Sequence, residues 1–257
     1  HRIRIRVKRP GAEVHARDGF YGVPQPEDPS SPISKSLYAA IFSPFQYSDL
    51  KVNLASGYIE DQGKGYLLQT SLHLDARDVG LTDGKDGKNL ISIEAASVTS
   101  DIQNAIRDSS AKRYEFEIRE ENIPWWREHG IRFSLRLPVK KPGSYYVRTA
   151  VRDPVTGKMG SAYQYIEIPD LRKNRLSLSN IFVFNRGEDL PWAASQTPEE
   201  FRQALYPDVR RDPRKSPALR TYAPGEAVEC AAIIYNAKSK KKQKPDLESR
   251  FFLFRNG

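Results

Sequence analysis

Residues 142–169 read PGSYYVRTAVRDPVTGKMGSAYQYIEIP and contain the clearest pair of strands in the chain. The first strand alternates between an apolar face that begins at Tyr145 and a polar face that carries Arg148 and Arg152. Residues 153–158 supply a loop, and the alternation then resumes until a final proline, which lacks an N–H group and stops the ladder. The stretch therefore predicts two antiparallel strands that close a β-sandwich.

Further strand patterns precede this pair at similar spacing. Alternating or apolar runs are found at residues 50–54, 68–74, 90–98, 114–119 and 131–137. A short helical pattern near residues 34–41 stops at Ser43-Pro44, because a proline disfavours helix at the residue before it. Six or seven short strands with few short helices predict an all-β chain, built as an immunoglobulin-like antiparallel β-sandwich. A closed barrel is the weaker alternative.

Composition divides the chain into four segments. Residues 1–23 begin with a strand pattern, and residues 24–32 contain four prolines, which predicts a linker. Residues 33–170 hold the sandwich. Residues 171–257 show further strand patterns, and we expect a second β-sandwich-like domain that is incomplete. Because the sequence opens inside a strand pattern, we expect the native chain to begin upstream.

The net charge of +9 is not spread evenly along the chain. Residues 1–35 carry +3, residues 36–199 sum to zero, and residues 200–257 carry +6. The basic character therefore belongs to the two end segments and not to the sandwich. No apolar run is long enough to predict a transmembrane segment.

Three tryptophans and a lysine run are the candidate ligand-binding residues. Trp125, Trp126 and Trp192 lie beside prolines and could stack on sugar rings, although such tryptophans more often cover a core edge. Lys240, Lys241 and Lys242 could hold a polysaccharide or another anionic polymer, although a solvated hairpin loop is the simpler interpretation. No aromatic residue interleaves these lysines, so we expect no specific nucleic-acid partner.

Motifs for catalysis, metals and cofactors are missing from the sequence. The four histidines are far apart and no paired His or Cys spacing occurs, so we predict no metal site and no cofactor. Cys230 lies in an apolar run and is expected to be a buried, inert thiol. Glu115 and Glu117 share a strand face as glycosidase carboxylates could, but a solvated charged face is the simpler prediction.

Several short motifs occur in a particular order along nearly the whole chain. They are VKRPG (7–11), RDGFY (17–21), FSPF (42–45), KPGSY (141–145), AVRD (150–153), GKMGSA (157–162), IPDL (168–171) and LSLS (176–179). This order resembles the C-terminal region of bacterial von Willebrand factor A (VWFA)-related proteins. The resemblance implies that residues 1–23 are the last strands and exit of an upstream A-type domain. It also implies export and a role in adhesion or protein assembly.

These observations lead to a ranked expectation for function. First is a non-catalytic, extracytoplasmic scaffold or adhesion-type module that binds a protein partner at the cell surface or after secretion. Second is a carbohydrate or anionic-polymer binding module, and third is a hydrolase. The Asp-x-Ser-x-Ser metal motif of A domains does not occur in this sequence, so the resemblance carries over no metal site.

Overall fold

The computed structural model describes residues 35–60, 65–185 and 213–238, together with residues 245, 247, 248, 250, 252 and 254. The predictions for residues 1–23 and for the linker at 24–32 lie outside these described residues. In the described part, the last strand of the sandwich ends at Ile168, just before the boundary expected at residue 170.

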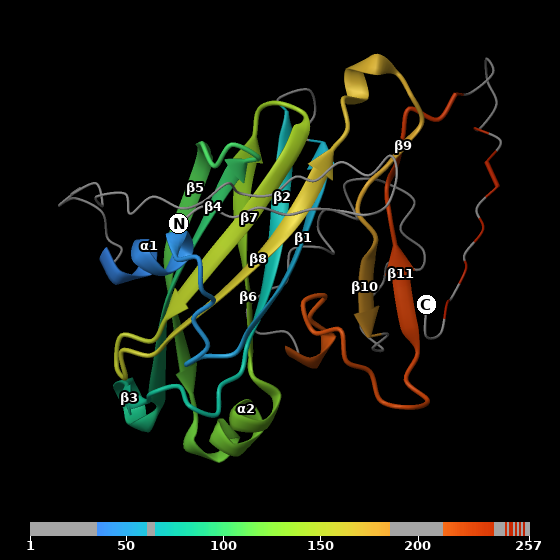
Figure 1. Ribbon diagram of the computed structural model, residues 1–257. Coiled ribbons are helices and arrows are strands. Elements are labelled where there is room, and N and C mark those ends of the chain that lie inside the picture. Colours follow the sequence, from blue (N-terminus) through green and yellow to red (C-terminus); the bar gives the residue numbers. More distant parts are fainter. Residues whose placement is uncertain are drawn as a thin grey trace.

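Two antiparallel sheets face each other across a common core (Figure 1). The first sheet has the order β1-β2-β6, with β1 (Val52–Glu60), β2 (Tyr66–Leu74) and β6 (Ile131–Val139). The second sheet has β5 (Ile106–Ile118), β4 (Asn89–Asp101), β7 (Gly143–Arg152) and β8 (Met159–Ile168) as neighbours. A short β3 (Thr82–Asp83) also pairs with β4. The predicted all-β, immunoglobulin-like sandwich is therefore confirmed.

The fourth long strand, β5, determines which variant of this sandwich the chain adopts. In constant-type immunoglobulin domains the fourth strand joins the sheet of the first two strands. Here β5 pairs with β4 along nearly its whole length, from Ile118 to Ile106, and stays in the second sheet. A tight hairpin explains this choice, because Asp101 accepts backbone hydrogen bonds from Gln103 and Ala105, at 2.9 Å each.

The core consists of the inward faces of both sheets. On β7, the predicted apolar face is confirmed, because Tyr145 is 7% exposed and Val147 and Val151 are fully buried. Phe133 of β6 and Tyr58 of β1 are each 1% exposed and lie among the largest buried side chains. Burial of such a side chain contributes about 1.5–3 kcal/mol to stability.

A short helix covers the outer face of the second sheet. Helix α1 (Lys35–Phe42) buries Leu37 and Ile41 against β4 and β7. The strands present small side chains there, Ala96 and Ala150, which leave room for the helix backbone to approach. The helical pattern near residues 34–41 is therefore confirmed, with its end before the Ser-Pro pair.

The two sheets are joined along one side by main-chain hydrogen bonds between the approach to β1 and the start of β8. Leu50 N donates to Met159 O at 3.0 Å, and Ser161 N donates to Tyr47 O at 2.9 Å. Gly160 lies between these two bonds and forms a bridge with Ser48. We call this line of contact the β1–β8 seam.

Beyond the sandwich, the chain forms two small two-stranded sheets beside β1 (Figure 1), which we together call the ribbon. Its members are β9 (Ser177–Leu178), β10 (Phe182–Asn185), β11 (Val228–Ala231) and β12 (Ile234–Tyr235), with β9 paired to β12 and β10 to β11. The Phe182 ring packs on Gly57 of β1, where any Cβ atom would collide with it. Cys230 lies on β11 and is exposed, so the prediction of a buried thiol is wrong.

The ribbon and β8 together occupy the free edge of β1. Alternate N–H groups on this edge donate to side-chain oxygens, namely Ser56 N to Gln164 Oε1 (2.8 Å), Tyr58 N to Asn180 Oδ1 (3.3 Å) and Glu60 N to Tyr235 Oη (3.1 Å). Unpaired edge groups invite pairing with a strand of another chain. These three acceptors therefore block strand addition along residues 56–60 of β1.

His73 lies on the outer face of β2 and is only 6% exposed. Its Nε2 contacts the carbonyl oxygen of His129 at 2.8 Å, so Nε2 carries the proton, while the buried Nδ1 has no hydrogen-bond partner in the described part of the chain. Burial lowers the pKa of His73, and the nearby Lys51 and Arg132 add to the decrease. A second proton on Nδ1 would place an unpaired charge in this site.

This environment predicts a pH-dependent stability. Below the unfolded pKa of about 6.5, the unfolded chain binds a proton that the folded His73 refuses, so the free energy of unfolding falls as the pH drops from about 7 to 5. Urea unfolding at several pH values should show this decrease in the wild type and a smaller one in His73→Gln. The Arg77 hydrogen bond lowers the pKa of Asp75, and hydrogen bonds from Arg107 and Ala105, which outweigh burial, lower the pKa of Asp101. These two carboxylates therefore change the free energy of unfolding only below about pH 4. Equal slopes above pH 5 in both proteins would contradict the assignment.

Candidate functional site

Two of the tryptophans singled out in the sequence, Trp125 and Trp126, lie on helix α2 (Ile123–His129). Trp125 is 36% exposed, while Trp126 packs against the core beside Phe116, with ring centroids 6.2 Å apart. The two indoles meet edge to face at an interplanar angle of 82°, so they do not form a flat platform. The other candidates, Trp192, Lys240, Lys241 and Lys242, lie outside the described residues.

The acidic pair on β5 faces solvent. Glu115 and Glu117 are exposed, while Tyr114, Phe116 and Ile118 are buried on the opposite face. Glu117 forms an ion pair with Lys88 at 2.6 Å, and this hydrogen bond lowers the pKa of the carboxyl group. The predicted solvated charged face is confirmed.

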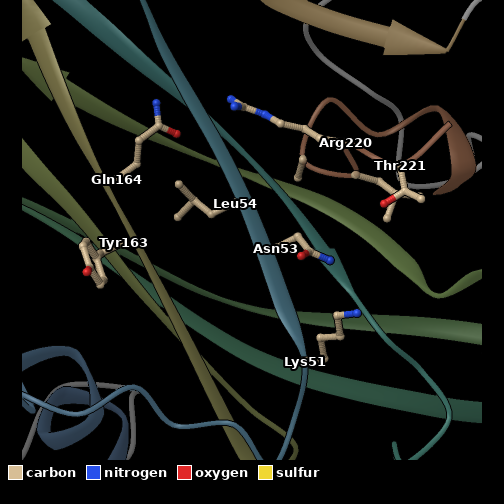
Figure 2. A pocket seen from close by; sticks show the side chains of 9 residues that line it. Lys51, Asn53, Leu54, Tyr163, Gln164, Arg220 and Thr221 are labelled. Atoms are coloured by element: carbon tan, nitrogen blue, oxygen red, sulfur yellow. The ribbon is translucent and has the colours of Figure 1, made fainter. Parts of the chain in front are cut away.

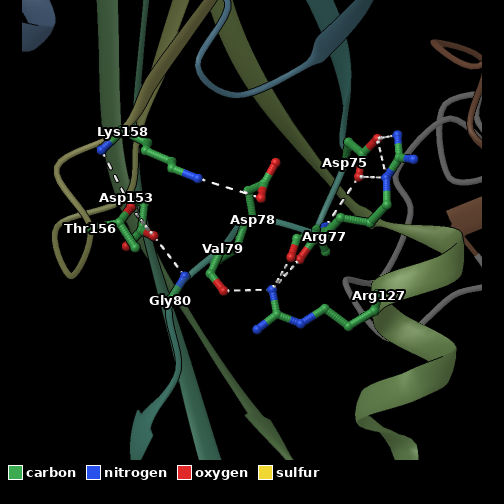
Figure 3. Close-up of polar contacts among 10 residues, drawn as sticks. Asp75, Arg77, Asp78, Val79, Gly80, Arg127, Asp153, Thr156 and Lys158 are labelled. Atoms are coloured by element: carbon green, nitrogen blue, oxygen red, sulfur yellow. Dashed lines mark hydrogen bonds and ion pairs between the residues drawn. The ribbon is translucent and has the colours of Figure 1, made fainter.

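A polar network below the sandwich fixes the loop that follows β2 (Figure 3). Arg127 of α2 donates from Nη1 to three carbonyl oxygens, those of Ala76 (2.7 Å), Arg77 (2.6 Å) and Val79 (2.7 Å). Asp153, at the end of β7, accepts from Gly80 N on the same loop at 2.7 Å. Each polar group here is engaged by another part of the chain, so the network holds structure together.

An exposed aromatic group lies on the outer face of β7 and β8. Tyr163 and Tyr165 of β8 are 68% and 49% exposed. Tyr165 lies opposite Tyr146 of β7, with ring centroids 5.5 Å apart, and Arg148 lies over the Tyr146 ring at 5.8 Å. The Tyr165 hydroxyl bonds to Ser144 Oγ at 2.9 Å. We call Tyr146, Arg148 and Tyr165 the tyrosine face, with Tyr163 at its border.

This face was not predicted as a site from the sequence. The alternation of residues 145–152 correctly assigns Tyr146 and Arg148 to the outward side of their strand. The same reasoning applied to β8 places Tyr163 and Tyr165 outward as well. Only the register, which sets Tyr146 against Tyr165 and Arg148 against Tyr163, brings the four side chains together.

An open depression of about 500 Å³ lies beside the tyrosine face, along the β1–β8 seam (Figure 2). We call it the seam cleft. The polar and aromatic side chains that line it are Lys51, Asn53, Tyr163, Gln164, Arg220 and Thr221. Figure 2 shows Arg220 extending from its loop toward Gln164 on β8. Three segments far apart in sequence therefore build one site, which the sequence alone did not reveal.

Two further properties concern only the described residues. None of their helices combines the length and the apolar character that crossing a membrane requires. In the same part of the chain, no group of three or more His, Cys, Asp or Glu side chains is arranged to hold a metal ion.

Comparison with known proteins identifies no family for this chain. No protein-family model matches the chain, and no curated protein matches its sequence. Among solved structures, a beta-glucuronidase of Bacteroides uniformis is similar over 46% of this chain and 13% of its own length, with 14% identity and a TM-score of 0.30. A calcium-binding mutant of Bacteroides uniformis beta-glucuronidase 2 is similar over 49% of this chain and 13% of its own length, with 13% identity and a TM-score of 0.31. Likeness at this level says nothing about the activity of this chain.

Proposed function

We propose that the chain is a non-catalytic protein-interaction module that docks a protein partner on its tyrosine face. The main support is a pair of exposed rings, Tyr163 and Tyr165, which share the outer face of β8, while the opposite face of this strand is buried in the core. Tyrosine and arginine are enriched at protein interfaces, because they offer a large contact area and a hydrogen-bonding group.

The tyrosine face is also held in place before binding. Tyr165 is fixed by its hydroxyl contact to Ser144 and by the Tyr146 ring, and Arg148 is held over that same ring. Side chains that are already ordered lose less conformational entropy when a partner binds. In contrast, the acidic pair on β5 is exposed and half engaged by Lys88, which supports binding over hydrolysis.

We further propose an extracytoplasmic setting, as the resemblance to VWFA-related proteins implies. In that setting the sandwich would act as a scaffold or adhesion unit, and the tyrosine face would be its contact with a neighbouring protein.

A photo-crosslinking amino acid at position 165 of the full chain, in the cells that make it, tests the proposal. We expect it to capture a defined protein, whose affinity for the purified chain then falls about tenfold or more in Tyr165→Ser, the loss typical of an interface hot spot. Phe45→Ser is the matched control, because Phe45 is 78% exposed and is not part of the tyrosine face. An equal loss in both variants, or no captured protein, would count against this function.

A further inference from the structure

The seam cleft holds two cationic side chains that have no carboxylate partner among the described residues. Lys51 and Arg220 both line the cleft and are exposed, and within the described residues neither forms an ion pair. The charge of Lys51 adds to the lowering of the pKa of Asp75, but the Asp75 carboxylate is bonded to Arg77, with Arg77 Nε to Oδ1 at 3.0 Å. An anion that enters the cleft therefore meets two positive charges that no carboxylate of the described residues pairs with.

The rest of the lining suits a polyhydroxylated ligand. Asn53, Gln164 and Thr221 offer amide and hydroxyl groups. Gln164 is held by two hydrogen bonds to the backbone of Ser56, at 2.8 and 2.9 Å, and each of its polar atoms keeps capacity for another bond. The Tyr163 ring, 68% exposed at the rim, provides a flat surface on which a sugar ring can stack.

The edge of β1 next to the cleft, at residues 56–60, is poorly suited to an extended peptide. Peptides that bind at a sheet edge pair with its free N–H and C=O groups. Along β1, the outward N–H groups of Ser56, Tyr58 and Glu60 are already bonded to side-chain oxygens. A peptide that extends past the cleft along β1 would there have to bind through its side chains alone.

From these observations, we propose that the seam cleft binds an acidic saccharide. Acidic groups on different sugar rings contact Lys51 and Arg220, one sugar ring stacks on Tyr163, and hydroxyl groups bond to Asn53, Gln164 and Thr221. This inference does not rest on the proposed protein interaction, because Lys51 and Arg220 lie outside the tyrosine face and the two surfaces share only Tyr163 at their border.

Calorimetric titration of the full chain with four probes tests this site. The probes are a heparin-derived oligosaccharide, an oligogalacturonate, a neutral maltooligosaccharide and a polyglutamate peptide of similar length. We expect binding of the sulfated or the carboxylated saccharide, with affinity reduced about tenfold by Arg220→Gln and again by Lys51→Gln, as loss of one charge-assisted contact each. Heparin carries both sulfate and carboxylate groups, so binding of the oligogalacturonate would show that carboxylates suffice, and binding of heparin alone would show that sulfate is required.

The control is Lys140→Gln, which removes the same charge from an exposed residue at the opposite end of the first sheet. It should leave the affinity unchanged, and all three variants should keep the melting temperature of the wild type. Three results would overturn the site: an equal loss in Lys140→Gln, binding of the neutral sugar as tightly as the acidic ones, or tighter binding of polyglutamate. Tyr165→Ser should leave saccharide binding intact, so failure of this proposal and failure of the protein-interaction proposal are distinguishable.

Discussion

Replacement of Asp153 by alanine is expected to lower the free energy of unfolding by about 3–5 kcal/mol, because it removes the acceptor of three charge-assisted hydrogen bonds. The carboxylate is fully buried. It accepts from Gly80 N (2.7 Å), Val155 N (2.8 Å) and Thr156 Oγ1 (2.6 Å). These bonds tie the loop after β2 to the β7–β8 loop, so one side chain connects the two sheets (Figure 3). Chemical denaturation monitored by tryptophan fluorescence measures the loss.

Two further variants separate the hydrogen bonds from the volume of the side chain. Asp153→Asn keeps the shape but points an amide N–H₂ at one of the donors, so we expect it to recover only part of the stability. Thr156→Val removes a single donor and should cost about 1 kcal/mol. A loss near 1 kcal/mol for Asp153→Ala as well would show that water replaces the carboxylate, contrary to the buried network.

The sandwich could be predicted from the sequence because its strands alternate cleanly. Where one face is buried and the other is wet, as on β6 and β7, the period of two fixes both the strand and its orientation. The turn residues predicted where the hairpins begin and end, and Pro44 predicted the end of α1.

Other features could not be predicted because they depend on register between strands far apart in sequence. The tyrosine face requires Tyr146 opposite Tyr165, and the seam cleft requires β1, β8 and the loop at Arg220 to meet. The exposed Cys230 was missed for a related reason. Its apolar neighbours suggested burial, but it lies on a two-stranded ribbon, which is too narrow to bury both faces.

The seam explains how the two proposed surfaces can lie side by side. β8 is held to the approach of β1 by main-chain bonds, and Gln164 continues the contact through its side chain. The outward side chains of β8 then serve the tyrosine face at Tyr165 and the cleft at Tyr163. A change that separates β1 from β8 should therefore affect stability and the cleft together.

Gly160→Ala provides that change. A Cβ atom at Gly160 would lie 2.2 Å from the carbonyl oxygen of Leu50 and 2.7 Å from Val52 Cγ2. The first neighbour is backbone and cannot rotate away, so the strands must separate and weaken the bonds of Leu50 and Ser161 across the seam. We expect a loss of about 2–3 kcal/mol in the free energy of unfolding, near the upper end for an overpacked site.

Gly157→Ala is the matched control in the same hairpin. Gly157 has a φ of +73° and open space around its Cβ position, so alanine there meets only the unfavourable left-handed backbone, at a cost of about 1 kcal/mol. The comparison separates steric separation of the seam from backbone strain, and calorimetric titration with the acidic saccharide adds a second readout. Because Lys51 follows Leu50 directly and Tyr163 follows Gly160 on β8, only Gly160→Ala should also weaken saccharide binding. If Gly160→Ala costs no more than Gly157→Ala, then β1 and β8 are not in close contact at this point, and the cleft that depends on the seam loses its support.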